Sequence, residues 1–181
     1  MSRSRKGKKR FKQQKDFVVF TPSVEDILLA HKRSCEMGIL PGTYTHGMSS
    51  LTGCLGEIAV CEYLPRSRYV GDKIYTHDVD YKDYRIEVKS KICSGQPKED
   101  FNAFVNCKKG ADIEADIFFF TRVRRDLARV YLVGWLPVPT FFDEATFKKK
   151  GHTEISGFTY KASGYDILIG ELNPPLQFKK S

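Results

Sequence analysis

The chain has 181 residues, of which 41% are hydrophobic, and its 30 Lys or Arg against 22 Asp or Glu give a formal net charge of +8. This length can bury a sizeable core and is most simply one domain, and the composition excludes a fully disordered chain. Because no apolar run approaches the roughly 18 residues of a membrane span and no signal peptide is evident, we expect an intracellular, cytoplasmic protein without a membrane partner.

The positive charge is concentrated at the N-terminus. Residues 1–15 hold eight basic residues and no acid, whereas the rest of the chain has 22 of each and is neutral. Such runs are usually disordered and bind polyanions, because each neutralised phosphate releases counterions. We expect residues 1–16 to form a disordered basic tail that binds nucleic acid through Arg3, Arg5, Lys6, Lys8, Lys9, Arg10, Lys12 and Lys15. A tail that tunes solubility or targets the nucleus would look the same.

Two helices are predicted next. Ser23 is a plausible N-cap for a helix that runs through VEDILLAHKRSCEM and stops at Gly38. Residues 41–50 are rich in turn formers, and a second helix is predicted from about residue 50 to residue 64, before Pro65.

The remainder of the chain is dominated by strands. Residues 73–92 read as strands with a tight reversal at Lys82-Asp83, residues 92–110 as irregular, and residues 115–123 and 128–136 as two buried strands. We expect a helix over about 139–149, a strand near 158–161 and a further strand-like segment, YDILIGEL, near the C-terminus. Helices interspersed among strands predict an α/β protein whose central sheet is covered on both faces.

The five cysteines, at positions 35, 54, 61, 93 and 107, contain no CxxC pair. An iron–sulfur cluster would need four cysteine ligands in a recognisable grouping, and structural zinc needs a similar pattern. The spacing supports neither, so small core residues are the simpler interpretation.

The predicted hairpin brings two acids together. If the chain reverses between Lys82 and Asp83, facing residue numbers sum to 165, so that Asp80 lies opposite Arg85 as a cross-strand ion pair and Asp78 lies opposite Glu87. Facing carboxylates repel unless a proton or a cation lies between them. Hard oxygen ligands suit Mg²⁺ or Mn²⁺, and Lys89 would stand beside that ion on the same face.

The second predicted helix contributes a third acid. Glu57 shares an apolar stripe with Gly53, Cys61 and Leu64, where a carboxylate is costly. Gly53 and Gly56 each cost about 1 kcal/mol of helix propensity relative to Ala. We expect them to allow a close approach of the helix to the sheet, which would bring Glu57 to the metal. A glutamate that reaches out to water from the helix edge is the alternative.

These residues together resemble the PD-(D/E)XK nuclease superfamily. GCLGE in a helix, an Asp, and Glu-Val-Lys closing a hairpin follow its pattern over residues 51–92, and a looser likeness to small phage and viral nucleases extends to residue 175. Glu57 matches the helical acid, Asp78 the first strand acid, and Glu87 and Lys89 the (D/E)XK. His77 replaces the name-giving proline, and Lys91 stands where some members have glutamine.

The resemblance implies a restriction-endonuclease-like fold, a central mixed β-sheet flanked by helices in the order αβββαβ with additions, formed by a single domain over residues 17–181. It also implies metal-dependent hydrolysis of DNA phosphodiester bonds, with Asp78, Glu87, Glu57 and the carbonyl of Val88 as ligands of Mg²⁺, or of Mn²⁺ in its place. Lys89 would orient the attacking water or offset charge on the phosphorus.

The substrate is less defined by the sequence. The sequence has no evident module for recognising a DNA sequence, such as a recognition helix or zinc finger. This favours a structure-selective or weakly specific endonuclease over sequence-specific restriction. RNA as substrate, exonuclease action and a homodimer with two active sites stay open. The alternatives from other classes are a non-catalytic nucleic-acid-binding protein that retains the fold, and a structural protein whose acidic pair is a solvated hairpin.

Overall fold

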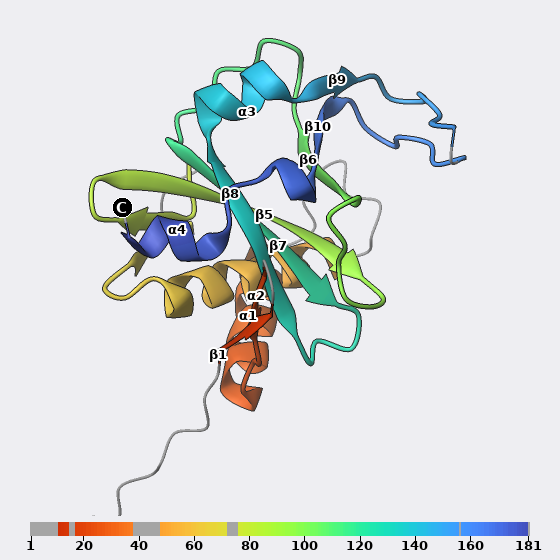
Figure 1. Cartoon of the computed structure of the whole chain (residues 1–181). Coiled ribbons are helices and arrows are strands. Elements are labelled where there is room, and N and C mark those ends of the chain that lie inside the picture. Colours follow the sequence, from red (N-terminus) through yellow and green to blue (C-terminus); the bar gives the residue numbers. More distant parts are fainter. Residues whose placement is uncertain (1–10, 15–16, 38–47, 72–75, 156, 181) are drawn as a thin grey trace, which may run out of the picture.

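The computed structural model describes residues 11–14, 17–37, 48–71, 76–155 and 157–180, and the following account is confined to them. Its centre is a seven-stranded sheet in the order β1-β2-β8-β7-β5-β4-β3 (Figure 1). Only β5 and β7 pair in parallel; all other neighbours are antiparallel. The strands are β1 (Phe11–Gln14), β2 (Phe17–Phe20), β3 (Arg68–Tyr69), β4 (Val79–Tyr81), β5 (Tyr84–Cys93), β7 (Ile117–Arg124) and β8 (Val130–Pro137).

A second, three-stranded sheet has the order β6-β10-β9. It consists of β6 (Asn102–Asn106), β10 (Gly164–Leu168) and β9 (Thr146–Lys148). Five helical segments complete the described chain: α1 (Val24–Met37), α2 (Met48–Tyr63), α3 (Val138–Glu144), the short 3₁₀ segment η1 (Ile169–Glu171) and α4 (Pro175–Lys180). The protein is therefore a mixed α/β fold, as the sequence predicted.

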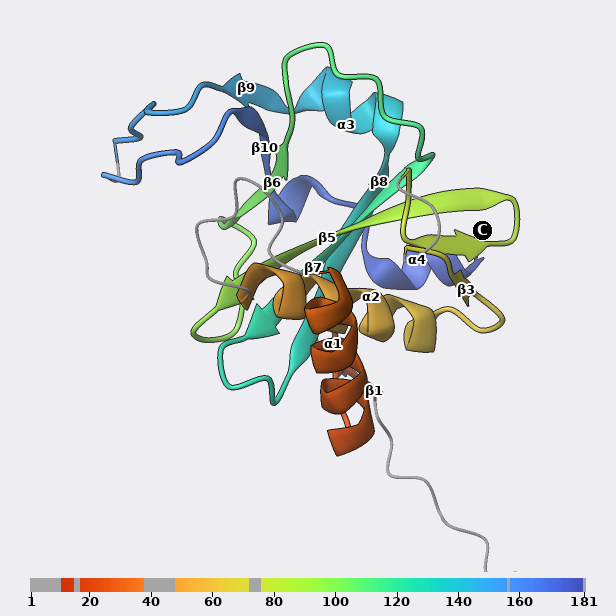
Figure 2. The same ribbon diagram turned by 180° about the vertical axis from the view of Figure 1, so that it is seen from behind.

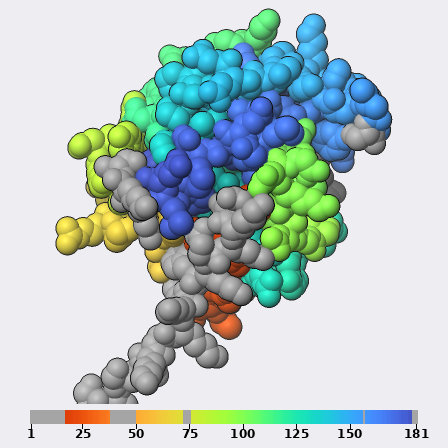
Figure 3. Space-filling model, viewed as in Figure 1, coloured from red at the N-terminus to blue at the C-terminus, as the bar shows by residue number. Residues whose placement is uncertain are grey.

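Two hydrophobic cores cover the two faces of the large sheet. One core joins α1, α2 and Phe178 of α4 to side chains such as Val79, Ile86 and Phe119. The other joins α3, β6 and β10 to side chains such as Phe118 and Phe120. Seen from behind, α1 and α2 lie across the sheet (Figure 2). The blue C-terminal segment packs along the surface next to α3 (Figure 3). Successive side chains of β7 thus pack into opposite cores, which explains why its sequence is apolar without interruption.

The predicted helix starts and hairpins are confirmed. The Asp26 amide donates to Ser23 Oγ (3.2 Å) and the Ser23 amide donates to Asp26 Oδ2 (2.7 Å), a reciprocal cap at the start of α1. α2 lies within two residues of its expected bounds. β4 and β5 reverse at Lys82, whose φ of 53° is the left-handed conformation of a tight turn. β7 and β8 match the two predicted buried strands.

Several expectations were wrong. Residues 11–14, assigned to a disordered tail, form β1, because their backbone pairs with β2 at the sheet edge. The helix expected over 139–149 ends at Glu144, since residues 146–148 pair with β10 instead. Residues 102–106, expected to be irregular, form β6, and residues 158–161 form only an isolated bridge between Thr153 and Thr159 rather than a strand.

The order of helices and strands along the chain also departs from the expected αβββαβ. Residues 94–129, all of them described, contain no helix between β5 and β8. The crossover that makes β5 and β7 parallel runs through β6 in the second sheet, and β7 joins β8 through a short turn. The loop expected at 41–50 lies largely outside the described residues. No helix in the described part of the chain is long and apolar enough to cross a membrane.

Candidate functional site: a carboxylate cluster beside the β4–β5 hairpin

The hairpin has the register that the sequence predicted. Val79 pairs with Ile86, Asp80 with Arg85 and Tyr81 with Tyr84, so each facing pair sums to 165. Asp78 immediately precedes β4, and its amide donates to the carbonyl of Ile86 (3.0 Å), the residue that already pairs with Val79, so the regular pairing ends before Asp78. The expected facing pair of Asp78 and Glu87 is not among the strand pairs, although Asp78 is close enough for the charge of Glu87 to raise its pKa.

Val88 holds the Asp78 carboxylate. Its amide donates to Asp78 Oδ2 over 2.7 Å. Because the N–H and C=O of one strand residue point toward the same neighbouring strand, the carbonyl of Val88 also lies on the Asp78 side. The backbone oxygen expected to act as a ligand is thus presented toward the carboxylate that would share the ion.

Glu87 and Lys89 form an ion pair. They alternate on one face of β5, and Lys89 Nζ lies 2.6 Å from Glu87 Oε1, with 30% and 22% of the two side chains exposed. The ammonium is therefore at the expected place, but in this structure it neutralises the carboxylate that was expected to bind a metal.

α2, which carries Glu57, approaches the sheet closely. Ser90 faces this helix, so Glu87 and Lys89, which alternate with it along β5, leave the strand on the opposite face, and Glu57 is only near enough for their charges to act on its pKa. A Cβ on Gly56 would lie 2.0 Å from Ser90 Oγ and 2.6 Å from Thr121 Oγ1, so only glycine fits there. This confirms the expected close approach for Gly56. Gly53 does not contact the sheet: a Cβ on Gly53 would have Glu57 Oε1 as its nearest neighbour at 3.7 Å, an ordinary contact.

Burial and mutual repulsion raise the pKa of two carboxyls in this cluster. Burial, and then the charges of Glu57 and Glu87, raise the pKa of Asp78 to about 8, even though the Val88 amide and Lys89 oppose the shift. Burial is also the main cause that raises the pKa of Glu57 to about 7, with Glu87 adding to it. The charges of these carboxylates therefore act on one another, and burial and repulsion disfavour the ionised forms of Asp78 and Glu57.

Two residues that sequence reasoning missed support Glu57. The Tyr69 hydroxyl hydrogen-bonds the Glu57 carboxylate, and the Arg33 guanidinium carbon lies 3.6 Å from the centroid of the Tyr69 ring. Both Tyr69 and Arg33 lower the pKa of Glu57 in opposition to burial. Nothing in their local sequence marks them, because α1 and β3 meet α2 only in the folded chain.

The donor set fits a hard divalent cation in its chemistry. The cluster offers three carboxylates and a strand carbonyl, and Glu57 Oε2 is buried without a hydrogen-bond partner among the described residues. However, the described residues contain no group of three or more His, Cys, Asp or Glu already arranged to hold an ion. Binding would therefore require these side chains to adjust, beginning with Glu87, whose carboxylate is held by Lys89.

The expected ion pair between Asp80 and Arg85 is not formed. Asp80 instead contacts Arg68 Nη2 (2.5 Å) and His77 Nε2 (2.6 Å). Arg85 pairs with Asp116 over 2.9 Å. The two residues are opposite each other as predicted, but each has a closer partner on a neighbouring segment, and neither belongs to the carboxylate cluster.

The expected nucleic-acid contacts of the tail fall almost entirely outside the described residues. Of the eight basic residues, this applies to Arg3, Arg5, Lys6, Lys8, Lys9, Arg10 and Lys15, and Lys12 is described only through the backbone of β1.

The comparisons with known proteins give no family. No protein-family model matches the chain, and no curated protein matches its sequence.

Proposed function

We propose that this protein is a metal-dependent deoxyribonuclease with the restriction-endonuclease-like fold of the PD-(D/E)XK superfamily. The observation that supports the proposal is the interaction among these acids: the charges of Glu57 and Glu87 both raise the pKa of the buried Asp78, and Lys89 pairs with Glu87. An uncompensated cluster of this kind costs stability, which is a common property of sites built for function. The parallel β5–β7 pair covered by α2 supports this fold, whereas the absence of a helix over residues 94–116, between β5 and β7, departs from the expected αβββαβ order.

Each residue has a role in this proposal. Asp78, Glu87, Glu57 and the Val88 carbonyl hold Mg²⁺ or Mn²⁺, which would supply a Lewis acid and lower the pKa of the attacking water. Lys89, which pairs with Glu87 here, would orient the attacking water or offset negative charge on the scissile phosphate. Tyr69 and Arg33 position Glu57. We expect the enzyme to act inside a cell on DNA of branched or nicked structure, and its five free cysteines suit a reducing compartment.

A second candidate is a nucleic-acid-binding protein that retains the fold without catalysis. The Lys89–Glu87 ion pair favours it, because a lysine that neutralises the carboxylate can replace the metal as the cluster's cation. This protein would bind DNA equally well in EDTA and would never cut it.

The experiment is a cleavage panel. Supercoiled plasmid, linear duplex, single strand and four-way junction are each incubated with the protein in Mg²⁺, Mn²⁺ or EDTA. The proposal expects cleavage with either ion, none in EDTA and none with Asp78→Asn or Glu87→Gln. Asp83→Asn is the matched control, because Asp83 lies in the turn of the same hairpin outside the cluster. Full activity of both cluster variants, or no cleavage of any substrate, would contradict the proposal.

A further inference from the structure

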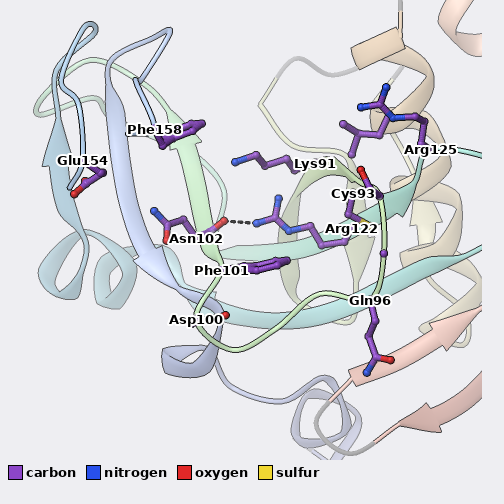
Figure 4. Close-up of a pocket in the computed structure, with 13 residues that line it drawn as sticks. Lys91, Cys93, Gln96, Asp100, Phe101, Asn102, Arg122, Arg125, Glu154 and Phe158 are labelled. Carbon is purple, nitrogen blue, oxygen red and sulfur yellow. Dashed lines mark hydrogen bonds between the residues drawn. The ribbon is translucent and has the colours of Figure 1, made fainter. Parts of the chain in front are cut away.

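A cavity of about 510 Å³ begins at Lys91, further along β5 than Lys89, and no residue of the carboxylate cluster lines it. Its walls come from β5, β7, the start of β6 and the segment between β9 and β10. We call this segment, residues 149–155 and 157–163, the arm, because it projects from the body of the protein in Figure 1. Lys91 and Arg122 pair across β5 and β7, and Figure 4 shows both side chains directed into this space, toward β6 and the arm.

Positive charge in the cavity is not balanced by the protein. Arg122 is only 5% exposed, and its guanidinium donates to the carbonyl of Asn102 (Figure 4). Within the described part of the chain, neither Arg122 nor Lys91 has a carboxylate at ion-pair distance. Lys91 is exposed to solvent, although partial burial of its ammonium and the neighbouring Arg122 charge lower its pKa. Arg122 is a buried cation whose partner is a neutral carbonyl rather than a carboxylate, which is costly, so an anion bound between Arg122 and the exposed Lys91 would stabilise both charges.

The acidic side chains near the cavity either have hydrogen-bond or ion-pair partners already or are fewer than the cations of the wall. Glu154 pairs with Lys148 over 2.7 Å. Asp166, which lines an adjoining cavity of about 280 Å³, accepts from Asn102 Nδ2 (2.6 Å) and from the Tyr160 hydroxyl. Asp100 is the remaining acid of the wall, against three cations when Arg125 is counted with Lys91 and Arg122. The cavity therefore attracts anions.

An aromatic wall faces the cations. Phe158 of the arm is 48% exposed, and its ring centroid lies 5.4 Å from Lys91 Nζ. Phe101, just before β6, is 40% exposed and also lines the cavity. Exposed aromatic rings beside a basic groove are what unpaired nucleobases stack on, and each such stack is sequence-tolerant. The volume is also within the range of small-ligand sites. An aromatic face next to two cations matches a base joined to a phosphate.

The cavity lies on the path that a DNA strand would follow. Glu87, Lys89 and Lys91 occupy alternate positions on one face of β5, so Lys91 lies roughly 7 Å beyond Lys89 at the usual rise per strand residue. A strand whose phosphate reaches the carboxylate cluster would place a neighbouring nucleotide at the cavity. A base still paired in a duplex could not enter it.

We propose that this cavity binds one unpaired nucleotide of the DNA substrate, with its phosphate between Lys91 and Arg122 and its base against Phe158. The proposal rests on the proposed nuclease function and narrows it: the preferred substrate has a single-stranded end or flap next to the cut. No local pattern in the sequence marks this site, since its residues come from four separate segments.

The test uses the full chain in Ca²⁺, which blocks cutting, and measures affinity by fluorescence anisotropy for two probes. The probes are a blunt duplex and the same duplex with a three-nucleotide single-stranded overhang. Wild-type protein should bind the overhang probe roughly tenfold more tightly, the size expected from one base–aromatic stack. Lys91→Gln and Phe158→Ala should each remove most of that preference and leave blunt-duplex affinity nearly unchanged.

The matched controls are Lys109→Gln, an exposed lysine away from the cavity, and Ile155→Ala, an exposed apolar residue of the same arm that does not line it. Both should keep the full preference. Thymidine 5′-monophosphate should compete with the overhang probe for wild-type protein but not for the Phe158 variant. Binding of the blunt duplex by that variant shows that it is folded.

The outcomes separate this proposal from the nuclease assignment. Equal affinity for the two probes, or a preference that survives both cavity variants, would overturn the nucleotide site even if the protein cleaves DNA. A preference that depends on Lys91 and Phe158 in a protein that never cleaves DNA would uphold the site and reject the nuclease.

Discussion

Asp78 is the residue at which function and stability oppose each other. Its pKa is raised to about 8 by burial and by the charges of Glu57 and Glu87, against about 3.9 in an unfolded chain. Between these two values the folded protein binds more protons than the unfolded one, so this group makes the free energy of unfolding fall as pH rises from about 4 to about 8. The penalty is complete above the folded-state pKa and absent in acid.

Asp78→Asn should therefore stabilise the metal-free protein at high pH only. Asparagine keeps an acceptor for the Val88 amide but carries no charge. In EDTA at pH 8.5 we expect the unfolding midpoint to rise by at least roughly 2–4 °C, the shift of 1 kcal/mol in a protein of this size. At pH 5 wild type and variant should melt together. Thermal unfolding of both proteins at the two pH values checks this, and a gain of the same size at both would show that the charge is not the cause.

Lys89 is the residue that distinguishes catalysis from simple charge balance. Because its ammonium holds Glu87 Oε1, removing it frees a carboxylate and should not weaken metal binding. Lys89→Ala should lower the single-turnover cleavage rate about 100-fold or more at saturating DNA and Mg²⁺, the usual effect of losing one transition-state donor. Lys98→Ala is the control, because Lys98 is an exposed lysine outside the carboxylate cluster. A wild-type rate in the Lys89 variant would leave this lysine as surface charge.

At the scale of the elements, the contact between α2 and the sheet places Glu57. Gly56→Ala would force a Cβ into Ser90 Oγ and Thr121 Oγ1, and overpacking of this kind typically costs about 1–3 kcal/mol. Gly53→Ala meets only an ordinary contact and should be neutral or stabilising by up to about 1 kcal/mol through helix propensity. Urea unfolding of the two variants should show opposite signs. Destabilisation of equal size would mean that α2 does not approach the sheet through Gly56.

Local patterns predicted local elements, and they failed where distant segments decide the structure. The β4–β5 register followed from the alternation around one turn, and Ser23 marked the start of α1, because a few neighbouring residues determine both. β6 was missed since its partner β10 is about sixty residues away, and α3 ended early because residues 146–148 pair with that same strand. The same limit applies to the site. Asp78, Glu87 and Lys89 share one hairpin, whereas Arg33 and Tyr69 join Glu57 only through the packing of α1 and β3.

At the scale of the whole molecule, charge is divided between a neutral body and a basic N-terminus. Residues 1–10 carry six of the eight basic residues of the tail and precede β1. If the tail supplies general affinity and the body supplies chemistry, the two should separate on truncation. The cut belongs before Phe11, because β1 pairs with β2 and its removal would expose a sheet edge.

Deleting residues 1–10 should lower DNA affinity and flatten its salt dependence, while leaving turnover at saturating DNA unchanged. The logarithm of the binding constant changes with the logarithm of salt concentration by about 0.9 per phosphate neutralised on duplex DNA. If half of the six cations in this segment engage phosphates, the slope should fall by roughly three units. The measurement is the affinity of full-length and truncated protein for one blunt duplex across a salt series in Ca²⁺, with cleavage rates measured separately in Mg²⁺. The blunt duplex keeps the nucleotide cavity out of the comparison. Parallel slopes would show that the tail does not contact DNA, and a loss of turnover would show that it contributes to the active site instead.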